Sequence, residues 1–269
     1  MSRTTSLLSP SRGIARLFFA GREQAVGPAR VGAFLEESQL RRMFQAIGGT
    51  YDLQNRILSL GRDAGWRKTL TERVRGRDGE TVVDMATGTG EIAIAVARRY
   101  PGVRVIGVDF SQRMLREARR KVDALPLETG RRVELRNGDI RRTAIGSSTA
   151  DVVTNVFALR NIPERAPVLA EFRRVLKPGG RLFIMETTVP STPAVQLLYG
   201  AWLSVIMPFL GNVLSRTDYA YSYLKHSIES FPETPQFLRE LAAAGFIRPR
   251  ATPLSFGIAV LFSAIRGDG

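Results

Sequence analysis

TVVDMATGTGEIAIAVARRY, from Thr81 to Tyr100, joins three kinds of local pattern in one short stretch. An apolar run ends at Asp84, a turn with glycines at positions 88 and 90 follows, and helical spacing of apolar residues comes next. Residues 103–110 (VRVIGVDF) then form a second apolar run of the strand type. A strand, a glycine turn, a helix and a second strand predict a βαβ unit with parallel strands.

The same alternation continues to the end of the chain. Further strands are predicted at residues 131–139, 150–158, 179–188, 246–256 and 257–265. Further helices are predicted at residues 111–125, 163–177 and 236–245. Pro163 is expected near the first turn of its helix, where a proline is tolerated. The pattern predicts an α/β fold with a doubly wound, mostly parallel sheet and helices on both faces.

Two segments precede this predicted sheet. Residues 36–78 have the pattern of two or three helices and are expected to form an N-terminal helical cap. Residues 1–35 carry five arginines against one glutamate and show no secretory signal pattern. That composition fits a flexible basic tail and is also typical of a mitochondrial transit peptide.

Overall composition limits the chemistry. The chain has 269 residues, 44% of them hydrophobic, which is enough for a sizeable core. Its net charge of +14 favours anionic surfaces of nucleic acid or phospholipid. Since there is no cysteine and only one histidine, disulfides, thiolate nucleophiles and cysteine-based zinc sites are excluded, and metal-independent chemistry is expected.

An uncharged stretch extends from Thr187 to Ser215 and is long enough to cross a bilayer. Pro208, Gly200 and Gly211 interrupt it, and catalytic-domain patterns lie on both sides. We therefore expect helices that line a lipophilic site or touch a membrane surface, as a lid inserted at about residues 189–230 of a domain spanning residues 79–269.

The glycine turn indicates a cofactor site. Glycines allow the sharp turn and the close approach of a ligand to the helix N-terminus. Asp109, at the end of the next strand, offers a carboxylate to the two hydroxyls of a ribose. Together these features predict a nucleoside cofactor. Gly88, Gly90 and Ala93 also match G-x-G-x-x-A, so a dinucleotide-dependent dehydrogenase has to be considered.

Three details favour S-adenosylmethionine over a dinucleotide. Asp84 and Glu91 place carboxylates beside the turn, where a pyrophosphate would be repelled and a cation attracted. Asp139, after the third strand, suits the exocyclic amine of adenine. Residues 176–180 (LKPGG) form a helix stop and tight turn before the fifth strand, as is typical of methyltransferases.

More specific residues lie outside this motif. They are Tyr51, Asp52, Asn55, Ser59, Gly61, Trp66 and Arg67 before the sheet; Asn155, Phe157, Leu159, Arg160 and Asn161 after the fourth strand; and the segments IMPFLG and YSYLKHSIESFP. With these residues the chain resembles a class I S-adenosylmethionine-dependent methyltransferase of the ubiquinone/menaquinone biosynthesis C-methyltransferase family. The positions that depart from the family pattern are Gln45, Asp63–Gly65, Thr87, Glu91 and Phe262.

The resemblance implies a Rossmann-like sheet of seven strands and assigns site residues. Those expected to bind the cofactor are Asp84, Thr87, Gly88, Gly90, Asp109, Phe110, Asn137, Asp139 and Asn155. Arg160 and Asn161 are expected to hold a developing phenolate, which makes them both catalytic and substrate-binding. Tyr51 (catalytic and substrate-binding) and Asn55 (substrate-binding) are four residues apart and close over the ring if their helix is continuous. His226, Trp66 and Trp202 are expected to be surface, core or lid residues.

The implied activity is C-methylation of a prenylated hydroquinone, either demethylmenaquinol or the related quinol of the ubiquinone pathway. The alternatives are a methyltransferase of another phenolic lipid, a non-catalytic quinone- or lipid-binding protein, and RNA methylation, for which no binding module is visible. Expected partners are the quinol, an anionic membrane surface and a second copy of the chain, with no nucleic acid. The expected location is the cytoplasmic side of the membrane, with the mitochondrial matrix as the alternative.

Overall fold

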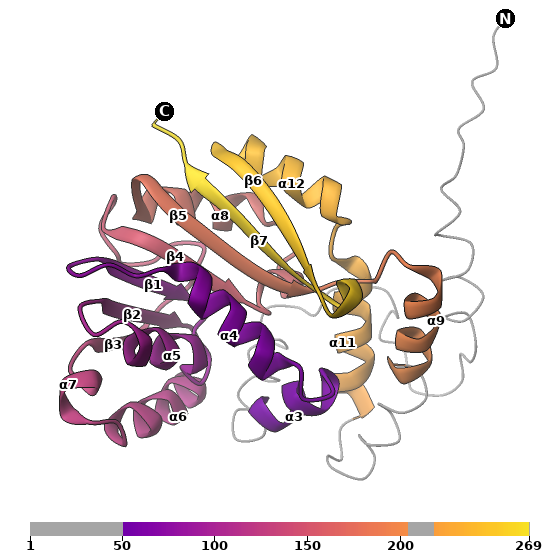
Figure 1. Cartoon of the computed structure of the whole chain (residues 1–269), viewed down its shortest axis with the longest axis horizontal. Helices are drawn as coiled ribbons and strands as arrows, with labels where there is room; N and C mark the ends of the chain where they lie inside the picture. The colour runs from indigo at the N-terminus through magenta and orange to yellow at the C-terminus, as the bar shows by residue number, and fades with distance from the viewer. Residues whose placement is uncertain (1–50, 204–217, 269) are drawn as a thin grey trace, which may run out of the picture.

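The computed structural model describes residues 51–203 and 218–268, which form one seven-stranded sheet with helices on both sides (Figure 1). The strands are β1 Thr81–Met85, β2 Arg104–Asp109, β3 Val133–Asn137, β4 Ala150–Val156, β5 Leu176–Thr187, β6 Phe246–Leu254 and β7 Ala259–Arg266. Their order is β3-β2-β1-β4-β5-β7-β6. Neighbouring strands from β1 to β5 pair parallel, whereas β7 pairs antiparallel with β5 and β6. The predicted doubly wound, mostly parallel sheet is confirmed.

The helices alternate with the strands as predicted. They are α3 Tyr51–Leu58, α4 Asp63–Val74, α5 Glu91–Arg99, α6 Gln112–Asp123, α7 Leu127–Gly130, α8 Ala166–Val175, α9 Pro193–Ala201, α11 Asp218–Ser230 and α12 Thr234–Ala243, with 3-10 turns η1 Leu159–Asn161 and η3 Ser255–Gly257. The sequence placed the start of α8 at Pro163, which is wrong. Because η1 occupies the chain after β4, the helix begins only at Ala166, with a proline in its first turn.

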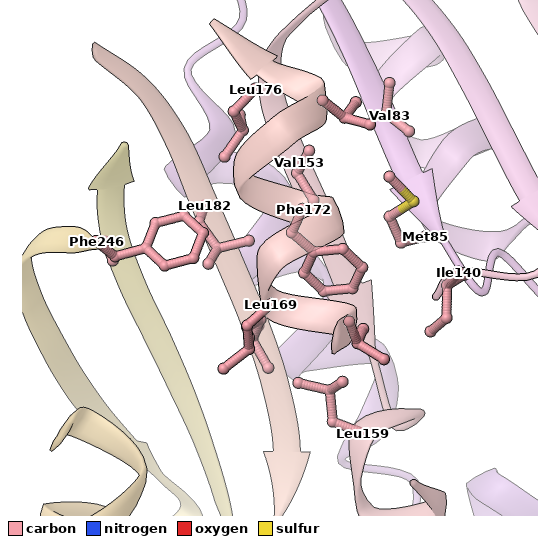
Figure 2. Packing of buried hydrophobic residues seen from close by; sticks show 14 of the residues in the cluster. Val83, Met85, Ile140, Val153, Leu159, Leu169, Phe172, Leu176, Leu182 and Phe246 are labelled. Carbon is pink, nitrogen blue, oxygen red and sulfur yellow. The ribbon is translucent and has the colours of Figure 1, made fainter. Parts of the chain in front are cut away.

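Two apolar layers sandwich the sheet. Val82 packs toward α4 and α5, whereas its neighbour Val83 packs toward α8 and α12, because successive side chains of a strand point to opposite faces. Figure 2 shows Phe172 of α8, fully buried, among Val153 and Leu182 of the sheet. Both faces of the central strands are therefore covered, which explains why the strands are continuously apolar in sequence.

The turn at residues 177–180 lies inside the bounds of β5 rather than before them. Leu176 pairs with Ala150, and the next pair joins Arg181 to Val152, so the residues between are extra on one strand. Gly179 lies among these extra residues with φ +71°, a left-handed backbone that favours glycine.

The carboxyl ends of the parallel strands lie on the side of the sheet where α3, α9 and α11 gather (Figure 1). In α/β sheets, ligands bind outside this edge. The predicted basic tail, the first part of the predicted helical cap and residues 204–217 of the predicted lid lie outside the described residues. Within residues 51–203 and 218–268, no helix combines the length and apolar character needed to cross a bilayer.

Candidate active site

A loop of residues 86–90, the glycine loop, joins β1 to α5. Ala86, Gly88 and Gly90 all have positive φ, at 57°, 55° and 81°. Two of them are glycines, as such a backbone favours. Ala86 is strained, and strain of this kind persists where the surrounding structure imposes it, commonly at functional sites. The amide of Thr87 donates to the Val108 carbonyl of β2 at 2.9 Å, which fixes the loop against the next strand.

Asp84 forms the polar floor of the glycine loop. Its side chain is buried, and its two oxygens accept hydrogen bonds from the hydroxyls of Thr87 at 2.6 Å and Thr154 at 2.7 Å. Burial raises the pKa of Asp84 to about 6, with the nearby Asp109 adding to the rise. A backbone hydrogen bond from Ala93 also acts on this carboxylate. Since all these partners are neutral, the buried carboxylate favours the approach of a cation.

Asp109 lies at the end of β2 and holds two loops together. One carboxylate oxygen accepts from the Gly88 amide and the other from the Ser111 amide, both at 2.8 Å. Burial raises its pKa to about 6. Since a carboxylate oxygen has two lone pairs, each oxygen keeps acceptor capacity for a ribose hydroxyl. Asn137 donates to the carbonyls of Asp109 and Phe110 at 3.0 Å, so it shapes the end of β2.

The free space and the unpaired atoms of this edge fit S-adenosylmethionine. Within the described part of the chain, a Cβ added at Gly88 would meet no atom within 4 Å, so space for a ligand is left there. Asn155 of β4 is fully buried and donates to the Met85 carbonyl at 2.7 Å. Its side-chain oxygen has no hydrogen-bond partner among the described residues. An orphaned acceptor beside a carboxylate suits the amino group of the methionine moiety.

Two predicted acidic residues are already paired. The Glu91 carboxylate lies 2.5 Å from the Lys121 ammonium and 3.9 Å from the Arg67 guanidinium, and Lys121 is shared with Asp52. The expected attraction of Glu91 for the cofactor stays a prediction, which has to compete with these ion pairs. Asp139 accepts from Arg141, whose guanidinium lies 2.5 Å away. A role of Asp139 toward adenine, which stays a prediction, has to compete with this ion pair.

Arg160 lies in η1, directly after β4, and is 5% exposed. Its guanidinium donates to the Glu186 carboxylate at 3.0 Å and lies 5.4 Å from the centroid of the Phe157 ring. Glu186, at the end of β5, is fully buried, and burial raises its pKa while Arg160 opposes the rise. Sequence reasoning missed Glu186, although a lone carboxylate inside the apolar strand LFIMETT indicates a cationic partner.

The other predicted substrate residues lie on neighbouring elements. Asn161, buried in the same turn as Arg160, donates to the Phe157 carbonyl at 3.4 Å. Asn55 of α3 is buried, and its amide nitrogen has no partner among the described residues. Tyr51 begins α3, but its side chain is outside the described part of the structure. Their substrate roles stay predictions.

A model of the ubiE/COQ5 methyltransferase family matches residues 33–266. The chain belongs to this family. The ubiquinone/menaquinone biosynthesis C-methyltransferase UbiE of Syntrophotalea carbinolica is 37% identical over 226 residues, 84% of this chain and 93% of that protein. The demethylmenaquinone methyltransferase of Thermus thermophilus is 37% identical over 219 residues, 81% and 97% of the two chains.

Solved structures agree on the fold. Haemonchus contortus phosphoethanolamine N-methyltransferase 2 in complex with S-adenosyl-L-methionine matches with a TM-score of 0.60 and 16% identity, over 90% of this chain and 61% of that chain. The sheet order found here is that of class I methyltransferases. The chain is an S-adenosylmethionine-dependent methyltransferase of the ubiE/COQ5 family, and S-adenosylmethionine is its cofactor.

Two departures from the family pattern have structural explanations. Phe262 of β7 is fully buried and packs against Phe237 at 4.7 Å and Phe231 at 6.3 Å between ring centroids, so it is a core residue. Asp63 begins α4, where its carboxylate accepts from the Ser59 hydroxyl and pairs with Arg67 at 3.2 Å. Gln45, a third departure, is outside the described residues.

The aromatic and imidazole side chains follow the expected roles. Trp66 is buried, donates to the Ser255 hydroxyl at 2.9 Å and contacts Phe157 edge to face, which makes it a core residue. Trp202 directly follows α9 and packs against the apolar cluster of Tyr199, Leu203 and Ile228. His226 of α11 is half-buried and lies 3.2 Å from the Ser230 hydroxyl, as a lid-packing residue does.

An ionic network that the sequence did not indicate ties α3 to the glycine loop. Asp52 of α3 accepts from the Thr89 hydroxyl and from the Lys121 ammonium, both at 2.7 Å. Lys121 of α6 also pairs with Glu91. Burial lowers the pKa of Lys121, but the hydrogen bonds and charges of Asp52 and Glu91 outweigh this effect and raise it. The contacts join the helix that carries Asn55 to the glycine loop, where the cofactor is expected to bind.

Replacing Lys121 by methionine is expected to loosen α3, because Asp52 and Glu91 then lose the cation that they share. Amide hydrogen exchange of α3 should rise several-fold, while the melting temperature falls by only a few degrees, as for a partly exposed network. Arg120→Met, which removes an exposed pair with Glu117 on the same helix, is the control and should leave α3 unchanged. Equal exchange in both variants contradicts the coupling.

Cofactor affinity is expected to rise with pH. Asp84 and Asp109 have pKa values of about 6 in the folded chain, above the ordinary 3.8, so the folded chain holds protons between pH 4 and 6 that the unfolded chain releases. The stability from those protons is lost as pH rises toward 6. A cationic cofactor favours the ionised carboxylates, so its binding should release protons near pH 6.

Between pH 5 and pH 7, the dissociation constant should fall about tenfold for each carboxylate that must ionise. Calorimetry in buffers of different ionisation enthalpy checks both the affinity and the proton release. Asp84→Asn should flatten the profile. Constant wild-type affinity across this range contradicts the proposed charge state.

Proposed function

We propose that this enzyme methylates a ring carbon of a prenylated hydroquinone, a demethylmenaquinol or the related quinol of the ubiquinone pathway. The observation that carries the proposal is the buried guanidinium of Arg160 at the carboxyl end of β4, beside the ring of Phe157. A cation that is fixed and buried, as the Arg160 guanidinium is, stabilises a developing phenolate. The names of the relatives that are 37% identical support the same substrate class.

When bound, the cofactor supplies an activated methyl group on a sulfonium. In the proposed reaction, the ring hydroxyl gives its proton to water, which leaves a phenolate beside Arg160. The neighbouring ring carbon then donates an electron pair to the methyl carbon, and the leaving electrons of the methyl group would stay on the cofactor's sulfur. The proton on that ring carbon leaves to water, and the ring oxygen takes a proton back. Arg160 stabilises the charge on the ring oxygen, and Asn161 supports it as a neutral donor. Arginine stays protonated at neutral pH, so Arg160 is not the base.

An apolar cluster beside this corner supports a lipophilic tail on the substrate. Tyr199 and Leu203, which lie in and just after α9, pack with Ile228 of α11, and Ile57 of α3 lies against them. Burying each methylene of an isoprenoid chain contributes about 0.8 kcal/mol. In the proposal these helices contact the tail while Arg160 and Asn161 hold the ring.

The test supplies the purified full chain with labelled S-adenosylmethionine and four acceptors: short- and long-tailed demethylmenaquinol, a prenylated phenol without the second hydroxyl, and total RNA. We expect one methyl on a ring carbon of both quinols, shown by mass spectrometry, with tighter binding of the long-tailed quinol. Preferred methylation of the phenol, or of RNA, replaces the proposed substrate. Equal affinity for both tails removes the role of the apolar helices. No binding of the cofactor by calorimetry favours a non-catalytic lipid-binding protein.

We also propose that the enzyme works at the cytoplasmic face of the membrane as a peripheral protein. A lipid-dissolved quinol and a net charge of +14 support this location, since anionic headgroups attract basic proteins. Binding to anionic vesicles should then fall with added salt and with removal of residues 1–35. Import of that segment into mitochondria would place the enzyme in the matrix instead.

A further inference from the structure

Tyr199 of α9 is a buried polar side chain that the sequence did not single out. It is 7% exposed, and its hydroxyl has no hydrogen-bond partner among the described residues. An unsatisfied buried hydroxyl destabilises the fold, and a phenylalanine would fill the same space without that cost. The hydroxyl therefore does not serve packing against Leu203 and Ile228.

The position of Tyr199 relates it to the substrate corner. α9 packs on α11, α11 contacts η1, and Arg160 of η1 exerts its charge on the Tyr199 phenol. Burial raises the pKa of Tyr199 far above its ordinary value, so the hydroxyl keeps its proton and can only donate to an anion. Asn55 of α3, with its unpaired amide nitrogen, is a second buried donor on a neighbouring helix.

We propose that the Tyr199 hydroxyl donates a hydrogen bond to the ring oxygen of a phenolic substrate, next to the guanidinium of Arg160. This inference rests on the proposed function. The bond positions the ring and discriminates an aromatic ring with an oxygen substituent from one without it. Tyr199 keeps its proton throughout, so no bond to hydrogen is broken.

The variant Tyr199→Phe tests the proposal, because its melting temperature and its catalytic efficiency should not fall together. In Tyr199→Phe the melting temperature should stay equal or rise, because an unsatisfied group is removed, whereas kcat/KM for a short-tailed demethylmenaquinol should fall about tenfold or more. Binding of S-adenosylhomocysteine should stay within about twofold, as expected for a residue that does not contact the cofactor.

Tyr100→Phe is the matched control. The Tyr100 hydroxyl donates to the Thr71 carbonyl at 2.9 Å, so this hydroxyl is structural. Its removal should lower the melting temperature and leave turnover unchanged. If Tyr199→Phe loses stability as Tyr100→Phe does, or keeps wild-type turnover, the inference is overturned.

A binding measurement separates this inference from the proposed function. The quenching of tryptophan fluorescence gives the affinities for 1-naphthol and for naphthalene, which differ by one hydroxyl. The wild type should prefer 1-naphthol, and Tyr199→Phe should lose about tenfold of that preference. A preference that persists in the variant overturns the inference even if quinols are methylated. A wild type that methylates no quinol overturns the proposed function, and the naphthol comparison then decides Tyr199 alone.

Discussion

Replacing Arg160 by alanine is expected to lower the rate of methyl transfer by about 10² to 10³-fold, as for the loss of one donor to a developing oxyanion. The structure adds a second effect. Glu186 is fully buried and ion-paired with Arg160 at 3.0 Å, so the alanine variant leaves a buried carboxylate without its cation. Breaking such a pair costs about 3–5 kcal/mol of folding stability. A single variant therefore mixes catalysis with unfolding.

A double variant separates the two effects. The double variant Arg160→Met with Glu186→Gln removes both charges. The backbone amide of Arg160 donates to Glu186 at 3.3 Å, and in the double variant the glutamine still offers an acceptor to this backbone amide. Replacing a buried ion pair by neutral groups is often close to neutral for stability. We expect the melting temperature to recover in the double variant while single-turnover methylation with saturating cofactor stays at least 100-fold down.

Arg165→Ala is the control for a lost ion pair alone. Arg165 joins α8 to α12 through two hydrogen bonds to Glu240, at 2.9 and 3.0 Å. Its loss should lower the melting temperature with little change in rate. Methylation by the double variant within about threefold of wild type, far short of the loss of an oxyanion donor, contradicts the electrostatic role of Arg160.

Replacing Gly88 by valine is expected to weaken cofactor binding by about 100-fold or more. A valine would place its branched side chain beside the glycine loop, where no atom of residues 51–203 or 218–268 lies within 4 Å of an added Cβ. It would also strain a backbone at φ +55°, by about 1–2 kcal/mol, and disturb the amide that donates to Asp109. Calorimetry with S-adenosylhomocysteine measures the loss.

Gly79→Val provides a matched control, because Gly79 has φ +82° and also no atom within 4 Å of an added Cβ. It lies just before β1, at the opposite end of that strand from the glycine loop. Both variants should lose similar stability, but only Gly88→Val should lose the cofactor. Equal cofactor affinities in the two variants show that the glycine loop does not hold the cofactor.

Much of the fold was predictable because each strand and helix has its own pattern of apolar residues within a short segment of the sequence. The apolar run TVVDM predicted β1, and the helical spacing at residues 111–125 predicted α6. In the structure Ser111 caps that helix, since its side chain accepts from the Met114 amide. The prediction was wrong at Pro163, because η1 ends at Asn161 and α8 begins only at Ala166, so Pro163 lies between the two elements. A proline and the helical spacing of apolar residues both indicate that a helix is near, but neither shows at which residue the helix begins after a turn such as η1.

The cofactor edge was predictable for the same reason. Gly88, Gly90 and Asp109 come where local patterns end, and the carboxyl ends of parallel strands meet at one edge of a sheet. The site residues could therefore be named, whereas their partners could not. Glu91 illustrates the difference, since its carboxylate is adjacent to the loop in sequence and yet is ion-paired with Lys121 from another helix.

By itself, the sequence determined the alternation of strands and helices, the backbone reversal at the glycines and the chemical types available at the sheet edge. Only the tertiary structure decided which groups meet: Arg160 with Glu186, 26 residues apart; Lys121 with Asp52, 69 apart; and Asp84 with Thr154, 70 apart. Periodicity reports the conformation of a single segment. Strand register and helix packing select the partners across segments, and those depend on the whole chain folding together.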